Sequence, residues 1–284
     1  MKKKLFNLLL LTILLCGSLF SPAIAYTDSH FEIHFLDVGQ ADSAIIVCDD
    51  RVMMIDGGNV SDSSLIYSYL RNTLDINHID YMICTHAHED HVGGLPAALN
   101  ACAVGKVYAP VIEYDSNAFR DFVKYVEIQG LVIQKPTAGD FYLLGSATVQ
   151  VLAPVKGNIE TENDSSIVLR IVYGETSFLF MGDAELKTEA DIIINSHANS
   201  YQLKSTLIKI GHHGGETSTS FTLLQAVKPD YVVISVGSPN DYGHPSNYTL
   251  DRLKAAKVKT YRTDMNGHII CFSDGKTLTF SSSK

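Results

Sequence analysis

His86-Ala87-His88-Glu89-Asp90-His91 places three imidazoles beside carboxylates within six residues. The stretch follows an apolar, β-favouring run at 79–84 and continues into Val92-Gly93-Gly94-Leu95. This context is typical of a buried strand that ends in a loop and then opens a helix. Imidazole suits zinc and similar divalent ions, and an added carboxylate allows a second metal beside the first. The stretch therefore predicts a divalent-metal site on a strand-end loop.

Residues 1–25 have the features of a secretory signal peptide. Lys2-Lys3-Lys4 is basic, the run at 5–15 is mostly apolar, and Ala23-Ile24-Ala25 has the small residues that precede a cleavage site. We expect an exported, extracytoplasmic protein whose mature part, residues 26–284, is one domain. An uncleaved leader that anchors the chain in the membrane is the alternative. No later segment is long and apolar enough to span a bilayer.

The chain is acidic, with a formal net charge of −9 at pH 7. Such a domain lacks the basic field that drives non-specific nucleic-acid binding, so nucleic acid is not the favoured partner. A polyanionic substrate at a metal site is still compatible with the sequence, because the metals bring their own positive charge.

Four cysteines follow the leader: Cys48, Cys84, Cys102 and Cys271. They form no CxxC pair and lie mostly in apolar runs, so we expect buried free thiols. An oxidising compartment would permit a disulfide, but the spacing does not indicate one.

The pattern along the mature chain alternates groups of strands with helices. Short apolar runs closed by Asp or Gly predict strands, and apolar residues at helical spacing predict helices. The expected strands lie at 31–36, 43–48, 52–55, 79–84, 107–108, 206–210 and 230–236, in a β-rich segment at 131–181, and in three short C-terminal strands. The expected helices lie at 61–73, 92–100, 116–129, 184–195, 218–227 and 246–256. This order is typical of one α/β (α+β) domain in which two mixed sheets pack face to face with helices outside.

Three further strand ends carry metal-ligand side chains beside glycine, which lets backbone and metal approach closely. They are Gly182-Asp183, Gly211-His212-His213-Gly214 and Gly243-His244-Pro245. Each also has an ordinary structural interpretation: Asp183 as a helix N-cap, the histidine pair as one core and one exposed residue, and His244 as part of a turn. Their coincidence at strand ends favours one site shared with the 86–91 loop.

With these motifs the chain resembles the metallo-β-lactamase superfold, whose signature is similar to His86-x-His88-x-Asp90-His91. Other matching motifs follow in order along the mature chain: 35–42, 54–58, 163–166, 182–183, 212–214 and 243–245. The set resembles the hydrolase domain of ComEC-type DNA-uptake proteins and secreted phosphorylcholine esterases. The resemblance implies an αβ/βα four-layer sandwich with a binuclear metal site along one edge.

The resemblance assigns the metal ligands residue by residue. His86 and His88 would hold the first metal, and Asp90 and His91 would hold the second. Asp183 would bridge the two ions.

The resemblance also assigns residues around these ligands. One histidine of the pair His212 and His213 would complete the second metal site, and His212 is favoured because Gly211 places it nearest the strand end. His244 would face the substrate phosphate or the leaving group. Asp56 and Asp37 would support the ligands from behind, with Asp56 as the buried acid that orients the metal loop.

The chain departs from the family pattern at residues 163–166. Many members supply another histidine to the first metal from this region, but here it reads Asn163-Asp164-Ser165-Ser166. The first site would then be poor in protein ligands, with an open position for water or a substrate oxygen. Asp164 is the residue that could fill that position.

These features predict an exported hydrolase that depends on two divalent ions, for which zinc is the first expectation and manganese also fits. The hypothesis is a metal-bridging hydroxide that attacks a phosphodiester in line, with Asp90 and His244 as the catalytic residues. The candidate substrates are a cell-envelope phosphodiester and a nucleic acid or nucleotide.

Two alternatives stay open. The same centre could hydrolyse a carbonyl substrate such as a β-lactam, a lactone or a thioester. A protein of another class, a non-catalytic envelope binding module that keeps the fold, would instead hold far less than one metal ion per chain.

Overall fold

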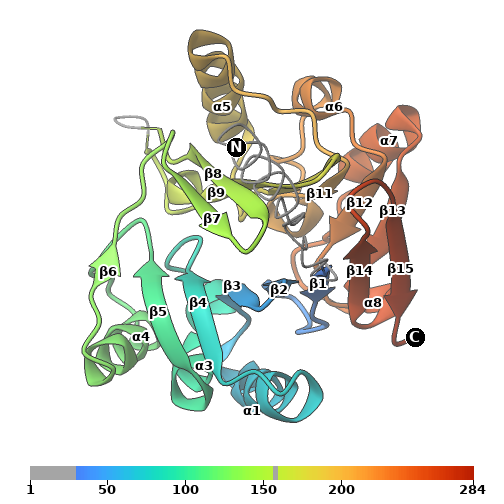
Figure 1. The fold of residues 1–284 in the computed structure, drawn as a ribbon. Coiled ribbons are helices and arrows are strands. Elements are labelled where there is room, and N and C mark those ends of the chain that lie inside the picture. The colour runs from blue at the N-terminus through green and yellow to red at the C-terminus, as the bar shows by residue number, and fades with distance from the viewer. Residues whose placement is uncertain (1–29, 156–158) are drawn as a thin grey trace, which may run out of the picture.

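The structure, a computed structural model, describes residues 30–155 and 159–284. This part of the chain forms two mixed β-sheets that pack face to face, with helices on the outer faces (Figure 1). The four-layer sandwich predicted from the resemblance is confirmed. Across the described ranges no helix combines the length and apolar character needed to cross a bilayer. The predicted signal peptide at 1–25 lies outside the described residues.

The first sheet has eight strands in the order β15-β14-β1-β2-β3-β4-β5-β6. Neighbouring strands are antiparallel from β15 to β3 and parallel from β3 to β6. The bounds are β1 Phe31–Phe35, β2 Ser43–Cys48, β3 Arg51–Gly57, β4 His78–Ile83, β5 Ala103–Tyr108, β6 Ile133–Gln134, β14 Ile269–Ser273 and β15 Leu278–Ser282. The parallel pairing aligns the carboxyl ends of β3 and β4 at one edge of the sheet.

The second sheet has seven strands in the order β13-β12-β11-β10-β9-β8-β7. Neighbours are parallel from β13 to β10 and antiparallel from β10 to β7. The bounds are β7 Phe141–Leu144, β8 Ala147–Ala153, β9 Val168–Tyr173, β10 Thr176–Phe180, β11 Leu207–Lys209, β12 Tyr231–Ile234 and β13 Lys259–Arg262. The carboxyl ends of β10, β11 and β12 therefore also share an edge.

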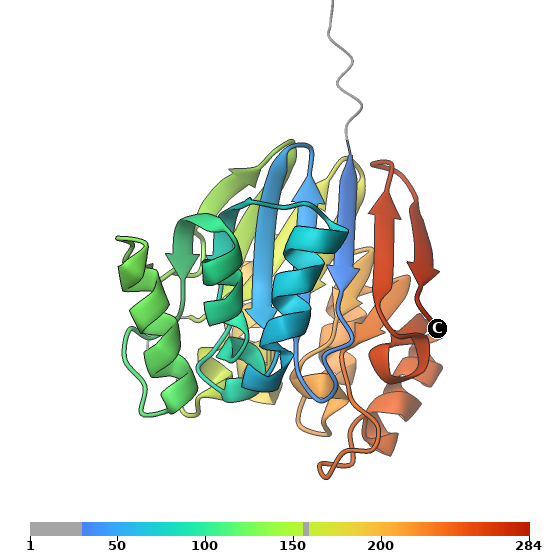
Figure 2. The ribbon, with the colours of Figure 1, turned by 90° about the horizontal axis from the view of Figure 1, so that it is seen from below.

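Helices cover the outer face of each sheet. Figure 2 shows α1, α3 and α4 lying across the first sheet, while α5, α6 and α7 cover the second (Figure 1). The bounds are α1 Ser63–Ser68, α2 Glu89–Val92, α3 Leu95–Ala101, α4 Asn117–Ile128, α5 Leu186–Asn199, α6 Phe221–Val227, α7 Asn247–Ala256 and α8 Thr263–Asn266. Short turns of other helix types lie at Val60–Asp62, Tyr69–Thr73, Asn163–Ser165 and His212–Gly214.

The helix expected at 92–100 begins only at Leu95, as α3, because Gly93-Gly94 separates it from the short α2. A Cβ atom on Gly94 would lie 2.1 Å from the carbonyl oxygen of Gly57. No side chain fits at that distance, so glycine allows the end of β3 to pack directly against the chain that follows the metal loop. The break fixes the position of the 86–91 loop against the sheet.

Alternating strand residues divide the core into three parts. Phe31, Ile33 and Phe35 of β1 point between the two sheets. Ile45 of β2 points the other way, toward the helices of the first sheet, and Ile208 of β11 points toward the helices of the second. The four cysteines expected to be buried free thiols are all buried and unpaired within the described residues.

Candidate metal centre

The candidate site lies where strands of both sheets end. In the first sheet, Asp56 stands at the end of β3 and His86 follows the end of β4. In the second sheet, Asp183 follows β10 and His213 follows β11. Because the strands within each set are parallel, their carboxyl ends meet at one edge. The packing of the sheets brings the two edges together.

Gly182 permits the close approach of the two edges. Its φ is +53°, and a Cβ atom there would lie 3.0 Å from the Cβ of Thr85 and 3.1 Å from that of Ser166. A side chain would strain the backbone and push the β10 loop away from the metal loop. The neighbouring Asp183 is held further by its own amide, which donates a hydrogen bond to Oγ of Ser166 at 3.0 Å.

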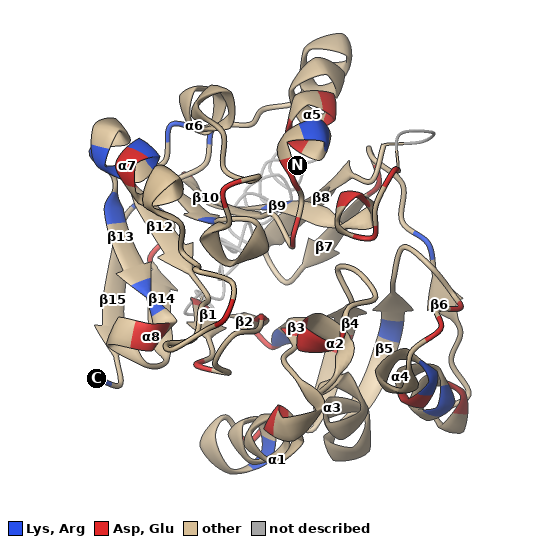
Figure 3. Cartoon of the chain, turned by 180° about the vertical axis from the view of Figure 1, so that it is seen from behind, with Lys and Arg blue, Asp and Glu red and all other residues tan. Residues whose placement is uncertain are grey.

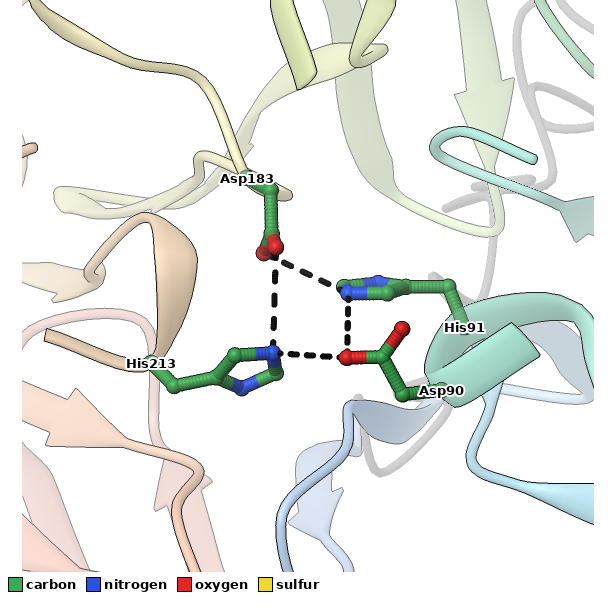
Figure 4. Close-up of side chains that lie close together, drawn as sticks. All are labelled: Asp90, His91, Asp183 and His213. Carbon is green, nitrogen blue, oxygen red and sulfur yellow. Dashed lines mark hydrogen bonds and ion pairs between the residues drawn. The ribbon is translucent and has the colours of Figure 1, made fainter. Parts of the chain in front are cut away.

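Four of the predicted ligands, Asp90, His91, Asp183 and His213, form a compact cluster (Figure 4). Each offers one ligand atom, and these atoms lie within 4.8 Å of one another. Nε2 of His213 is 3.1 Å from Oδ2 of Asp90 and 3.7 Å from Oδ2 of Asp183. Nε2 of His91 is 3.3 Å from Oδ1 of Asp183. Asp90 and His91 belong to α2, beside the first sheet, whereas Asp183 and His213 follow β10 and β11 of the second sheet.

His86 and His88 form a second group of donors beside the cluster. Nε2 of His86 lies 3.0 Å from Nδ1 of His88 and 3.9 Å from Oδ2 of Asp183. The carboxylate of Asp183 thus lies within about 4 Å of His86 on one side and of His91 on the other. The resemblance assigned a bridging ligand to this residue.

These donors fit divalent ions. Zinc binds imidazole nitrogen at about 2.0–2.1 Å, so two ligands of one tetrahedral ion lie about 3.3 Å apart. The pair of His86 and His88 and the pair of His91 and Asp183 have nearly that separation. Among the described residues, neither Nε2 of His91 nor Oδ1 of Asp183 has an aligned hydrogen-bond partner, although both atoms are buried. Buried polar atoms are normally paired, and a cation would satisfy both.

Asp56 contacts both Thr85, just before the 86–91 loop, and His91 at its end. Its Oδ1 accepts a hydrogen bond from the amide of Thr85 at 2.7 Å, and its Oδ2 accepts one from the hydroxyl of Thr85 at 2.7 Å. Oδ2 also lies 2.9 Å from Nδ1 of His91. A proton on Nδ1 is thereby fixed, which leaves Nε2 of His91 free to bind a cation.

Asp42 and Lys209 are functional candidates that the sequence reasoning did not select. Asp42 pairs with the ammonium of Lys209, and its Oδ1 lies 3.3 Å from Nδ1 of His213. The carbonyl oxygen of Ser235 is 3.0 Å from the same Nδ1. A lysine inside the apolar run 207–210 was the feature that could have revealed this group, because a buried lysine requires a buried partner.

The structure does not bring Asp37 to the cluster. Its carboxylate pairs with Nζ of Lys284 at 2.8 Å, and its amide donates to Nδ1 of His268 at 2.9 Å. The role expected of Asp37 is taken by Asp42, five residues later in the same motif. The chain bends at residues 39–41 between them, and Asp37 pairs with Lys284 whereas Asp42 pairs with Lys209.

The structure also directs His213 into the cluster, in place of the favoured His212. His213 is only 2% exposed, and its Nδ1 is tied to Ser235 below. His212 turns toward α5, where its Nδ1 lies 3.0 Å from Oε1 of Glu185. Its Nε2 is 4.0 Å from Oδ2 of Asp183, so it borders the cluster from the solvent side.

A cavity of about 380 Å³ opens in front of the cluster. His244 forms part of its wall, with its ring centre 5.2 Å from that of His212. Asn240 fixes this loop, because its side chain accepts from the amide of His244 at 3.0 Å and donates to the carbonyl of His244 at 2.6 Å. His244 therefore faces the space that a substrate would enter.

The histidine-free segment 163–166 does not place Asp164 at the first site. Oδ1 of Asp164 accepts a hydrogen bond from the hydroxyl of Thr188 at 2.9 Å. Asn163 instead lines the cavity, and Ser166 holds Asp183. The donors contributed to the cavity by this segment are thus an amide side chain and no imidazole.

Burial and dense opposite charge shift the pKa values of the cluster. For Asp183, burial favours the neutral form, but His91 and His213 outweigh it and lower the pKa well below the usual range. For His213, burial opposes protonation, but Asp183 and Asp42 raise the pKa to about 10. Burial, and then His91, lower the pKa of His86. The Asp183 carboxylate is therefore ionised at neutral pH, as binding of a cation requires.

The chain is similar in sequence to bacterial competence proteins. The sequence pattern of the Metallo-beta-lactamase superfamily matches residues 36–238. ComE operon protein 3 of Bacillus subtilis is 27% identical over 271 residues, which are 89% of this chain and 34% of that protein. Competence protein ComA of Neisseria gonorrhoeae is 28% identical over 255 residues, 90% of this chain and 34% of the relative. The chain thus spans about a third of the length of these relatives.

Solved structures show the same fold. The metallo-beta-lactamase fold protein YhfI from Bacillus subtilis superposes with a TM-score of 0.53 at 9% identity. The match covers 88% of this chain and 100% of that one. At this identity the likeness concerns the fold alone.

Proposed function

The chain belongs to the metallo-beta-lactamase superfamily, and on that premise we propose that it is a phosphodiesterase that depends on two divalent ions. The family match shows a metal-dependent hydrolase fold, and four candidate metal ligands cluster in it. The position of Asp183 carries the proposal. It lies between the pair His86 and His88 on one side and the cluster of Asp90, His91 and His213 on the other.

In this proposal each residue has a defined part. His86 and His88 would hold the first ion, Asp90, His91 and His213 would hold the second, and Asp183 would be shared between them. When bound, two divalent ions would activate water as a nucleophile near neutral pH and neutralise charge on the phosphoryl oxygens.

The surrounding residues keep these donors in place and face the substrate. Asp56 and Asp42 fix the rings of His91 and His213 from behind. His244, across the cavity, donates a hydrogen bond to the phosphoryl group or to the leaving oxygen. Asn163 offers an amide to a substrate oxygen at the entrance.

Three observations support a phosphodiester over a carbonyl substrate. The site is rich in carboxylates, no histidine comes from 163–166, and one relative, ComA of Neisseria gonorrhoeae, is a competence protein. The acidic chain favours a compact phosphodiester, from the cell envelope or a nucleotide, over a long polyanion. Zinc is the first expectation for the ion, and manganese also fits the mixed nitrogen and oxygen ligands.

The proposal includes export. The basic, apolar and small-residue segments at 1–25 support it. A fusion of residues 1–30 to a reporter that is active only outside the cytoplasm tests this part. Retention of the reporter inside the cell would contradict it.

The hydrolysis of bis(p-nitrophenyl) phosphate by protein loaded with zinc or with manganese tests the activity. We expect turnover that EDTA abolishes and that Asp183→Ala lowers at least a hundredfold, since loss of even an outer support costs about 10–100-fold in such sites. Nitrocefin serves as the carbonyl control. Hydrolysis of nitrocefin without hydrolysis of the diester would overturn the proposal, and metal content far below one ion per chain would favour a binding module.

A further inference from the structure

A second hollow lies beside the metal cavity. It has a volume of about 520 Å³ and is lined by the loop after β5 and the first turns of α4. None of the predicted metal ligands lines it. We call this hollow, formed by Ile112–Asp115, Phe119, Arg120 and Val123, the α4 groove.

Tyr114 connects the α4 groove to the metal centre. Its ring stands edge to face against His88, with the ring centres 6.5 Å apart. On the other side it stands edge to face against Phe119 at 6.2 Å. Tyr114 therefore lines the α4 groove and packs against His88, which lines the metal cavity.

The floor of the α4 groove is apolar. Phe119 is fully buried beneath it, and Val123 continues the apolar surface along α4. Ile112 is 49% exposed, although it is a large aliphatic residue in a loop. An apolar group placed here would remove this surface from water at a gain of roughly 25 cal/mol per Å².

The rim of the α4 groove is acidic. Glu113 and Asp115 are exposed and line it, and Figure 3 shows acidic residues on nearby α2 and α4. Arg120 offsets only one of these two charges, since its guanidinium donates to Asp115 at 2.7 Å and to Asn117 at 2.7 Å, so Glu113, Asp115 and Arg120 together carry a formal charge of −1. A second anionic group would be repelled here.

We propose that the α4 groove binds an uncharged aromatic or apolar substituent of the phosphate ester whose phosphoryl group lies at the metal centre. The inference rests on the proposed function and deepens it, because it selects among phosphodiesters. A substrate with an apolar group next to the phosphate would be favoured, and one with a further phosphate at that position would be disfavoured.

Binding of two matched phosphonates to the zinc-loaded protein, measured by calorimetry, tests the α4 groove without requiring turnover. 3-Phenylpropylphosphonate should bind about tenfold more tightly than propylphosphonate, as expected for partial burial of one ring. The 4-carboxyphenyl analogue should lose that advantage. Ile112→Ser and Tyr114→Ala should each reduce the ratio of the two dissociation constants toward one. Tyr248→Ala on α7, also an exposed ring at 64%, is the matched control and should keep the wild-type ratio.

Equal affinity for the two phosphonates, or no binding of either, would overturn the inference. A ratio that Ile112→Ser and Tyr114→Ala both leave at the wild-type value would also overturn it. Because Ile112 is exposed, its variant should fold normally, which its circular dichroism spectrum checks. Tighter binding of 3-phenylpropylphosphonate than of propylphosphonate, without hydrolysis of any diester, would overturn the proposed function alone. Hydrolysis without an aryl preference would overturn the α4 groove alone.

Discussion

Lys209 and Asp42 form an ion pair that is buried directly behind His213. The two side chains are 4% and 6% exposed, and they come from β11 of the second sheet and from the residue that precedes β2 of the first. Asp42 also lies 3.3 Å from Nδ1 of His213. The pair therefore ties the two sheets together at a proposed metal ligand, so stability and metal binding should be linked there.

Lys209→Met should destabilise the protein strongly. The change leaves the Asp42 carboxylate buried without its cation, and breaking a buried pair in this way costs about 3–5 kcal/mol. Denaturant unfolding of the EDTA-treated protein measures the loss. Lys276→Met, at the exposed turn between β14 and β15, is the matched control. The double variant with Asp42→Asn should recover much of the loss, and a Lys209→Met protein as stable as wild type would contradict the buried pair.

Asp56→Asn should weaken metal binding about 10–100-fold, because the amide no longer holds the proton on Nδ1 of His91. Competition with a zinc chelator measures the affinity. Asp50→Asn, an exposed residue six positions earlier, serves as the control. Unchanged affinity in the Asp56 variant would show that His91 is oriented by other contacts.

His213→Ala and His212→Ala should differ in their metal content. Nε2 of His213 lies 3.1 Å from Asp90 inside the cluster, whereas Nε2 of His212 lies 4.0 Å from Asp183 at its border. Elemental analysis should find about one ion fewer per chain for His213→Ala and a wild-type content for His212→Ala. The opposite result would restore His212 as the ligand, as the sequence alone favours.

Asp49→Asn should reduce stability in a pH-dependent way. Asp49 joins the turn after β2 to the turn before β8, where its Oδ2 accepts from the amide of Ser146 at 2.8 Å. Burial raises the pKa of Asp49, but the hydrogen bonds from Ser146 outweigh it, so the folded pKa is lowered. A lowered folded pKa contributes stability that is present above the unfolded pKa and is lost as the pH falls through the folded value. We expect wild type to exceed the variant by about 0.5–1 kcal/mol at pH 7.

The test for Asp49 is urea unfolding at a series of pH values. The difference between wild type and variant should shrink as the pH falls from about 4 toward 2. A difference that stays constant over this range would mean that the Asp49 carboxylate does not carry the interaction.

Removal of metal should lower the melting temperature by about 8–16 °C. An ion that binds only the folded state stabilises it by about 4 kcal/mol at a thousand times its dissociation constant, and each kcal/mol shifts a domain of this size by about 2–4 °C. Calorimetric scans with and without EDTA measure the shift. Asp183→Ala should show almost none, and an equal shift in that variant would place the metal elsewhere.

Local patterns in the sequence determined the strand and helix segments and most of the site. The runs at 43–48, 79–84 and 176–180 are apolar and β-favouring over their own length, so their ends could be located without tertiary contacts. Ligand-type residues at such ends, beside glycine, then pointed to His86, Asp183 and the 212–213 pair. The expected helix at 92–100 was less accurate, because its break depends on contact with β3.

Tertiary structure alone decided which of two neighbouring candidates enters the site. His212 and His213 are adjacent, and Asp37 and Asp42 lie in the same motif at 35–42. Their spacing therefore cannot show which residue of each pair enters the site. The choice depends on the backbone direction at each residue and on partners that lie far away in the chain, such as Ser235 below His213 and Lys209 beside Asp42. The contact of Asp42 with Lys209 forms only when the two sheets pack, and the contact of His213 with Ser235 forms only when β11 and β12 pair within the second sheet.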